Sequence, residues 1–312
     1  MSFHRRYILA GVVVPLAAAA LWASYYIFVL AVTPGTDPSA VFVLPFLIGG
    51  AAYAVWAWAN GHAAAFWAMW RQPAAWGRVG LLLLMQLSVL AATYVAGPVD
   101  SALLSLIGDV VLTPIVVAVG MVAYRDRFRV PWLWVGMALC LAGGGLAIVA
   151  NAGLRAVHAS AYVILVTIPV SVALYFLVTA RENERTDPNA VVAQSMLAAG
   201  LLSIPIALVL PGGLAGIGRV TPGPLLILAA TGLSSFFIAP ALYFEAIRRA
   251  GYVVPPMMMT GIPVFAALLG WGILGIAIPT LGIIGIPVAV GGALIALLGE
   301  MSVRPTTHDV AV

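Results

Sequence analysis

One carboxylate stands out among the side chains that could do chemistry, because Asp109 lies inside a long apolar stretch. An ionisable group at such a depth in a membrane costs about 2.5–3.5 kcal/mol on insertion scales. We expect no basic residue inside the apolar stretches, so a buried ion pair is not predicted. Asp109 is therefore predicted to face a polar cavity or to be protonated part of the time, and either state suits the binding of a cationic amine or a proton. A structural, hydrogen-bonded acid is the alternative.

Polar side chains recur at the spacing of one helix face around this carboxylate and again later in the chain. The first stripe is Ser101, Ser105, Asp109 and Thr113. The second stripe is Thr167, Ser171, Tyr175 and Thr179. We predict that both stripes line a cavity, with hydrogen bonds back to the same helix as the alternative for each hydroxyl. Gln86 is predicted at a depth close to that of Asp109 on a neighbouring helix, where its amide can donate to the carboxylate.

Two further groups complete the candidate site. Trp22 and Tyr175 are aromatic residues predicted near the middle of apolar stretches, and we expect both to line the cavity. Glu245 precedes Arg248 and Arg249 by three and four residues. That spacing predicts an ion pair on one helix at the membrane interface, with an inner gate as the alternative.

The composition places these residues in an integral membrane protein. About 63% of the 312 residues are hydrophobic and only 8% are charged, whereas soluble domains carry roughly 25% charged residues. The 14 basic residues are all arginine, so the chain has no lysine for a Schiff base or for the phosphate-binding loop of an ATPase. Cys140 is the single cysteine, and the four histidines fall in predicted loops or tails. We therefore predict no cofactor, no metal site and no nucleic-acid partner.

Ten stretches of about 20 mostly apolar residues predict an all-α protein with ten transmembrane helices. They cover residues 7–32, 40–60, 78–96, 101–123, 131–150, 160–180, 189–210, 223–247, 253–274 and 280–298. With the N-terminus inside, twelve arginines lie on the cytoplasmic side and only Arg155 and Arg219 lie outside. Because basic residues favour the cytoplasmic side, both termini are predicted there. The predicted location is the cytoplasmic (inner) membrane of a bacterium.

The fifth and tenth predicted helices resemble each other. Pro131 matches Pro279 at the same offset at which the glycine pair 143–144 matches 291–292. We predict two five-helix repeats, 1–153 and 154–300, followed by a short cytoplasmic tail, 301–312. Since five is odd, the second repeat must be inverted in the membrane, and inverted repeats are typical of secondary transporters with a central site. Chance similarity between apolar helices is the alternative.

The two similar helices also carry faces of small residues. These are Gly136, Cys140 and Gly144 in the fifth helix and Gly285, Ala289 and Ala293 in the tenth. Such faces permit close helix packing. We predict packing within one chain rather than dimerisation, and hence a monomer or a weak homodimer.

Residues 241–297 resemble the C-terminal signature of EamA-type members of the drug/metabolite transporter superfamily, most specifically in the run 262–270. Residues 18–32 resemble the first helix of that family, and 101–149 resemble the first-half copy of the signature. Two departures are present: Gly275 is followed by Ile276 where the family usually has glutamate, and Asp109 stands where it usually has an apolar or small residue. The resemblance implies ten helices, alternating access and export of small organic metabolites or drugs.

Together these features predict a secondary active transporter rather than an enzyme. We expect it to export a neutral, zwitterionic or cationic solute such as an amino acid, a metabolite or a drug, with the lipid bilayer and protons as its other partners. A multiply anionic solute would lack a counter-charge in the predicted spans. An intramembrane enzyme and a channel are the alternatives. The sequence shows neither a catalytic Ser–His or Cys–His pair at depth nor a selectivity-filter motif.

Overall fold

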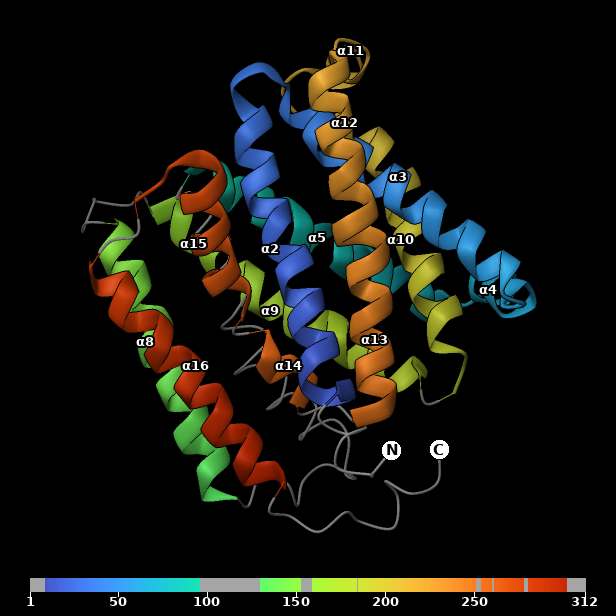
Figure 1. Cartoon of the computed structure of the whole chain (residues 1–312). Helices are drawn as coiled ribbons and strands as arrows, with labels where there is room; N and C mark the ends of the chain where they lie inside the picture. Colours follow the sequence, from blue (N-terminus) through green and yellow to red (C-terminus); the bar gives the residue numbers. More distant parts are fainter. Residues whose placement is uncertain are drawn as a thin grey trace.

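The computed structural model describes residues 9–95, 130–152, 159–183, 185–250, 254–259, 261–277 and 280–301. Every regular element in these ranges is helical (Figure 1). The helices overlap nine of the ten predicted spans, and the predicted span 101–123 lies outside the described residues. Asp109, Ser105 and Thr113 therefore also lie outside the described residues.

The first part of the chain supplies a long helix pair followed by a short turn of helix. A π-helical turn, η1 (Leu9–Val13), leads into α2 (Val14–Val32), and a 3-10 turn, η2 (Thr33–Gly35), leads to α3 (Pro38–Ala59). The short α4 (Ala63–Met69) precedes α5 (Pro73–Val95), and α8 (Pro131–Ala152) ends this half. Proline at the first position of α3, α5 and α8 suits a helix start, because its fixed φ is helical and its missing N–H would be unpaired there anyway.

The second part of the chain begins with α9 (Ala159–Asn183), α10 (Pro188–Ala207) and the short α11 (Gly213–Gly218). The next span is one continuous helix made of three segments: α12 (Pro222–Thr231), the π-helical η5 (Gly232–Ile238) and α13 (Ala239–Ala250). It is followed by α14 (Val254–Met258), α15 (Gly261–Leu274) and α16 (Thr280–Met301).

Five helical runs among the described residues are long and apolar enough to cross a membrane. They are Gly11–Gly35, Pro38–Ala59, Pro73–Ala92, Pro188–Ala207 and Pro222–Arg249. The third of these begins five residues earlier than predicted, because the helix starts at Pro73. Arg78 thus lies inside a span and not in the preceding loop.

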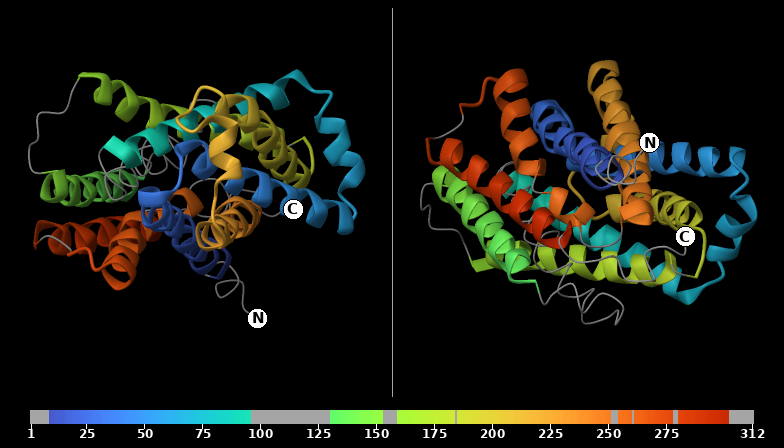
Figure 2. Two further views of the ribbon diagram at one scale, coloured as in Figure 1. Left: turned by 90° about the horizontal axis from the view of Figure 1, so that it is seen from above. Right: turned by 60° about the horizontal axis from the view of Figure 1, so that its bottom comes forward.

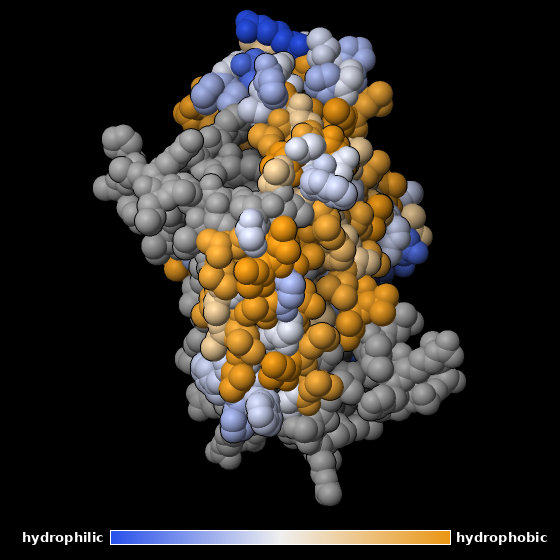
Figure 3. Space-filling view, turned by 60° about the vertical axis from the view of Figure 1, so that its left-hand side comes forward, coloured by the Kyte–Doolittle hydropathy of each residue, from blue (hydrophilic) through white to orange (hydrophobic). Residues whose placement is uncertain are grey.

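The outer surface fits a lipid environment. Figure 3 shows the side of the molecule on which α8 and α16 lie, and apolar residues dominate that face. Exposed side chains of α8 and α16 include Leu141, Ile283, Leu294 and Leu298. In water such a surface would be unfavourable, whereas in hydrocarbon it costs nothing.

The two similar helices predicted from the sequence, α8 and α16, pack side by side (Figures 1 and 2). A Cβ atom on Gly136 would lie 2.5 Å from the Gly292 carbonyl oxygen, and one on Gly143 would lie 2.5 Å from that of Gly285. The thiol of Cys140 donates to the Ala289 carbonyl oxygen over 3.3 Å. Since residue numbers rise along α8 as they fall along α16, the two helices are antiparallel. Their small-residue faces thus pack against each other within one chain.

A second antiparallel pair forms between α3 and α10. A Cβ atom on Gly50 would lie 2.6 Å from the Met196 carbonyl oxygen, and one on Gly200 would lie 2.9 Å from that of Phe46. These helices occupy the second position of each predicted repeat. Glycine at both points allows the two backbones to approach closely.

Candidate functional site

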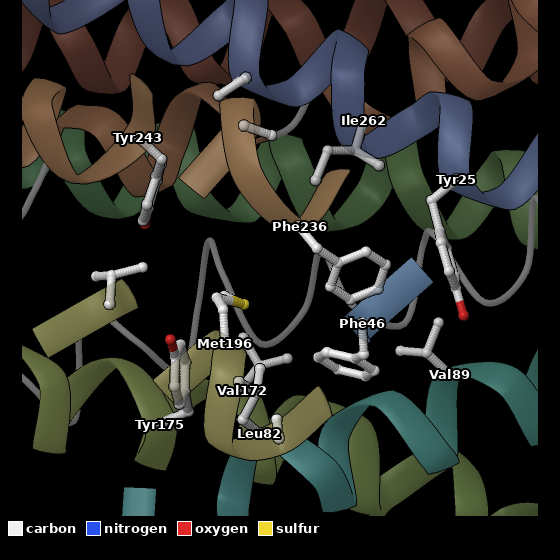
Figure 4. Close-up of a cluster of buried hydrophobic side chains, with 14 of the residues drawn as sticks. Tyr25, Phe46, Leu82, Val89, Val172, Tyr175, Met196, Phe236, Tyr243 and Ile262 are labelled. Carbon is white, nitrogen blue, oxygen red and sulfur yellow. The ribbon is translucent and has the colours of Figure 1, made fainter. Parts of the chain in front are cut away.

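A partly open cavity of about 70 Å³ lies between helices from both parts of the chain. Its lining residues on the N-terminal helices are Trp22, Tyr25 and Tyr26 of α2 and Leu82, Met85, Gln86 and Val89 of α5. Those on the later helices are Val172, Tyr175, Phe176, Met196, Ser235, Phe236, Phe244 and Ile262. Figure 4 shows several of these side chains directed into a common space, from α2 on one side and from α5 and α9 on the other.

The lining is rich in aromatic side chains, and none of the lining residues within the described part of the chain carries a charge. The only polar side chains among them, apart from the aromatic rings with a polar atom, are those of Gln86 and Ser235. Aromatic faces attract apolar rings and cations. A few polar groups in an apolar wall are the usual makeup of a site for a small organic molecule.

The backbone of η5 explains how Trp22 is held at this wall. In a π-helix the Ser235 carbonyl would accept a hydrogen bond from residue 240, but Pro240 has no N–H. The indole N–H of Trp22 donates to the Ser235 carbonyl oxygen instead, over 2.9 Å. The Ser235 hydroxyl in turn donates to the Leu21 carbonyl oxygen over 2.9 Å. This reciprocal pair joins α2 to the irregular turn and fixes the Trp22 ring.

Gln86 presents the polar group that is most available to a solute. Its Oε1 atom is buried and has no hydrogen-bond partner among the described residues. A buried amide oxygen without a partner costs about 1–3 kcal/mol. A solute with an N–H or O–H donor could recover that free energy. The partner predicted for Gln86, Asp109, lies outside the described residues.

The residues of the second polar stripe differ in their surroundings: one lines the cavity, and others bond back to their own helix. Tyr175 lines the cavity and is almost fully buried. Ser171, one turn earlier, is buried but does not line the cavity, and its hydroxyl donates to the Thr167 carbonyl oxygen over 2.7 Å. The Thr179 hydroxyl bonds back in the same way, to the Tyr175 carbonyl oxygen over 2.7 Å. Of the candidate residues that the structure describes, it brings Trp22, Gln86 and Tyr175 together at the cavity, and Ser171 lies behind the wall.

The expectation that no basic residue lies inside a span is wrong. Arg78, in the second turn of α5, has a side chain with no exposed surface. It forms an ion pair with Glu182 at the end of α9. Its Nε donates to the Ser195 hydroxyl over 2.6 Å, and its Nη2 donates to Gln194 Oε1 over 2.8 Å. We call Arg78, Glu182, Gln194 and Ser195 the Arg78 cluster.

One local signal could have located Arg78. The pair Gln72–Pro73 is a helix start, which places Arg78 in the second turn of the helix and not before it. No signal in the sequence connects Arg78 with Glu182, because the two residues lie in different parts of the chain. The burial of Arg78 follows from tertiary packing alone.

Glu245 forms the ion pairs that its spacing predicted. One of its carboxylate oxygens accepts from Arg248 Nε over 2.8 Å and the other accepts from Arg248 Nη2 over 2.6 Å. Arg249 also contacts this carboxylate. All three residues lie in the last turns of α13, and both arginines are exposed.

Comparison with solved structures finds the same fold in other proteins. Eight chains of solved structures match the fold. One of them, described only as a crystal structure of a protein, matches with a TM-score of 0.72 and 19% sequence identity, over 93% of this chain and 98% of that chain. At that identity the likeness shows the fold alone. No curated protein matches the sequence.

The family comparison falls on the second half of the chain. The sequence model of the EamA-like transporter family matches residues 159–298. This range includes α9, α10, η5, α13 and α15, which supply the cavity wall opposite α2 and α5. The match over residues 159–298 is thus to the EamA-like transporter family of the drug/metabolite transporter superfamily, the family that the sequence resemblance predicted.

Proposed function

We propose that the protein is a secondary active transporter that exports a small neutral, zwitterionic or cationic organic solute by alternating access. The observation that carries this proposal is the aromatic cavity, in whose wall the Gln86 Oε1 atom has no partner among the described residues. An amino acid, a metabolite or a drug suits a wall that is mostly apolar and carries a few polar groups.

The packing of the helices supports the proposed pair of inverted repeats, 1–153 and 154–300. Two pairs of helices at equivalent positions, α3 with α10 and α8 with α16, pack antiparallel to each other. Antiparallel packing of equivalent helices is expected when two repeats are related by a two-fold axis in the membrane plane. The cavity receives α2 and α5 from the first proposed repeat and its remaining walls from the second.

The charge distribution supports the proposed solute class. A phosphate or another multiply anionic group needs basic partners in a dry site. Arg78 does not line the cavity, and Glu182 neutralises it. The aromatic wall instead offers a favourable surface for rings and for organic cations.

The experiment that tests this proposal is uptake of radiolabelled solutes into proteoliposomes, with solutes chosen by thermal stabilisation of the purified protein. Gln86→Ala should weaken binding and transport of solutes with a hydrogen-bond donor, because it removes an acceptor that no described residue of the chain occupies. Gln72→Ala, which lies before α5, is the matched control and should leave both unchanged. Accumulation of a sugar phosphate by the wild-type protein would contradict the proposed solute class.

Proton coupling through Asp109 is part of the proposal and has its own test. If Asp109 binds a proton and the solute alternately, Asp109→Asn should abolish uphill transport and spare solute exchange. If it binds an amine directly, the same substitution should weaken the binding of cations and spare neutral solutes. Uptake with and without a pH gradient separates these outcomes, and unchanged transport by a less stable variant would show a structural acid.

A further inference from the structure

The Arg78 cluster joins helices from both proposed repeats at a single side chain. Arg78 extends from α5, whereas its partners belong to α9 and α10. Its Nη2 also lies 3.3 Å from the Val191 carbonyl oxygen of α10. Arg78, Gln194 and Ser195 have no exposed surface, and only Glu182 retains a small exposed fraction.

The cluster lies in line with the cavity. On α5, Arg78 precedes Leu82, Gln86 and Val89 by four, eight and eleven residues, which places all four on one face of the helix. On α9, Glu182 follows Tyr175 by seven residues, or two turns. The cluster therefore lies directly beyond one end of the cavity.

The same end of the molecule carries the exposed arginines. Arg181 lies in the last turn of α9, Arg185 lies in the loop that follows, and Arg248 and Arg249 lie in the last turn of α13. An excess of basic residues marks the cytoplasmic side of a membrane protein. In the orientation proposed above, the Arg78 cluster thus lies between the cavity and the cytoplasm.

We infer that Arg78 and Glu182 form the cytoplasmic gate of the cavity. In this structure the gate is closed, because the guanidinium and its partners fill the space between α5, α9 and α10. Alternating access requires α5 to part from α9 and α10 at this end, and parting exposes both charges to water at the moment the pair breaks. Hydration then replaces the ion pair, so both the closed and the open states can be stable. This inference rests on the proposed transport function and deepens it.

The gate can be tested without any solute, by labelling a cysteine in the cavity wall. Cys140→Ser removes the single native cysteine, and Met85→Cys then places one reporter thiol in the lining of the cavity. A charged, membrane-impermeant maleimide added to the cytoplasmic face of vesicles should label this reporter slowly. Arg78→Gln and Glu182→Gln should each raise the labelling rate from that face by about tenfold or more, in the range of typical conformational couplings.

Two controls define the result. Arg185→Gln removes an exposed arginine from the neighbouring loop and should not change the labelling rate. Arg78→Lys keeps the charge but loses the planar fork of donors, so its labelling rate should lie between those of the wild type and Arg78→Gln.

The gate is overturned if Arg78→Gln and Glu182→Gln fold with a normal elution profile and the reporter stays protected. It is also overturned if Arg185→Gln raises labelling equally, or if neither Arg78→Lys nor Glu182→Gln yields folded protein, because the pair is then structural. Since labelling needs no solute, loss of the proposed transport activity would leave this test intact.

Discussion

Arg78 and Arg248 both pair with a glutamate, but the two pairs differ in almost every physical respect. Arg78 reaches Glu182 from another helix and is fully buried. Arg248 pairs with Glu245 within one turn of α13, and its side chain is 46% exposed. A buried charge that loses its partner keeps the full free-energy cost of desolvation, whereas an exposed charge that loses its partner is solvated by water. We therefore expect the same chemical substitution to have very different effects at the two sites.

The largest effect is expected from Arg78→Gln, which leaves Glu182 without its partner. Breaking a buried ion pair typically costs about 3–5 kcal/mol. The free energy of unfolding, measured by titration with sodium dodecyl sulfate in mixed micelles, should fall by that amount. If the free energy of unfolding falls by less than about 1 kcal/mol, the value typical of an exposed ion pair, water already reaches Arg78.

A double variant separates the charge from the packing at this site. Arg78→Met with Glu182→Leu removes both charges and keeps apolar volume. Replacing a buried pair by apolar residues is often close to neutral in stability. The double variant should therefore recover most of the stability that Arg78→Gln loses, while the gate no longer closes through a charge.

The next largest effect is expected where the two halves meet without any charge. In Gly136→Val the new Cβ atom would lie 2.5 Å from the Gly292 carbonyl oxygen, so α8 and α16 must move apart. Overpacking of this kind costs about 1–3 kcal/mol, and backbone contact places it near the upper end. Unfolding by sodium dodecyl sulfate measures the loss. Gly80→Val, at an exposed position of α5 with open space around its Cβ, is the control.

These two sites also show what the sequence could and could not predict. Apolar runs placed the helices, and four of the small residues predicted to form packing faces, Gly136, Cys140, Gly285 and Ala289, lie where α8 and α16 meet. The pair Glu245–Arg248 was predictable because its partners are three residues apart. Arg78 was misplaced because its partners come from remote segments, and hydropathy alone assigned it to a loop.

Some residues of the candidate site could likewise be predicted from the sequence, and others could not. Trp22 and Tyr175 could be placed near mid-membrane from their position in apolar runs, and both line the cavity. The role of Ser235 could not be predicted, because it depends on the π-helical turn that Pro240 follows and on the contact with Trp22. Ser171 shared the spacing of Tyr175, but spacing cannot tell a hydroxyl in the wall from one that bonds its own helix.

A smaller effect is expected from Ser195→Ala, which leaves the Arg78–Glu182 pair in place. The substitution removes the acceptor for Arg78 Nε. A donor on a buried charged group that loses its partner costs about 2 kcal/mol. The melting temperature of the purified protein should fall, and Ser203→Ala, whose buried hydroxyl donates to the Gly200 carbonyl oxygen of its own helix, should change it less. Equal losses would show that Ser195 does not support the charge of Arg78.

The smallest effect is expected from Glu245→Gln. Exposed ion pairs contribute about 0.2–1 kcal/mol and are screened by salt. The carboxylate also lies near the C-terminal end of α13, where the helix dipole disfavours negative charge, so its removal offsets part of the lost pairing. The loss of stability should be below about 1 kcal/mol and should shrink further as salt is added.

This last substitution decides between the two roles considered for Glu245. An interfacial ion pair predicts that Glu245→Gln transports at the wild-type rate once the amount of folded protein is matched. An inner gate predicts a changed transport rate, and a raised rate of labelling at Met85→Cys from the cytoplasmic face, in a protein of nearly normal stability. If that second pattern appears, the exposed pair acts together with the Arg78 cluster, and the contrast between the two pairs holds for stability but not for gating.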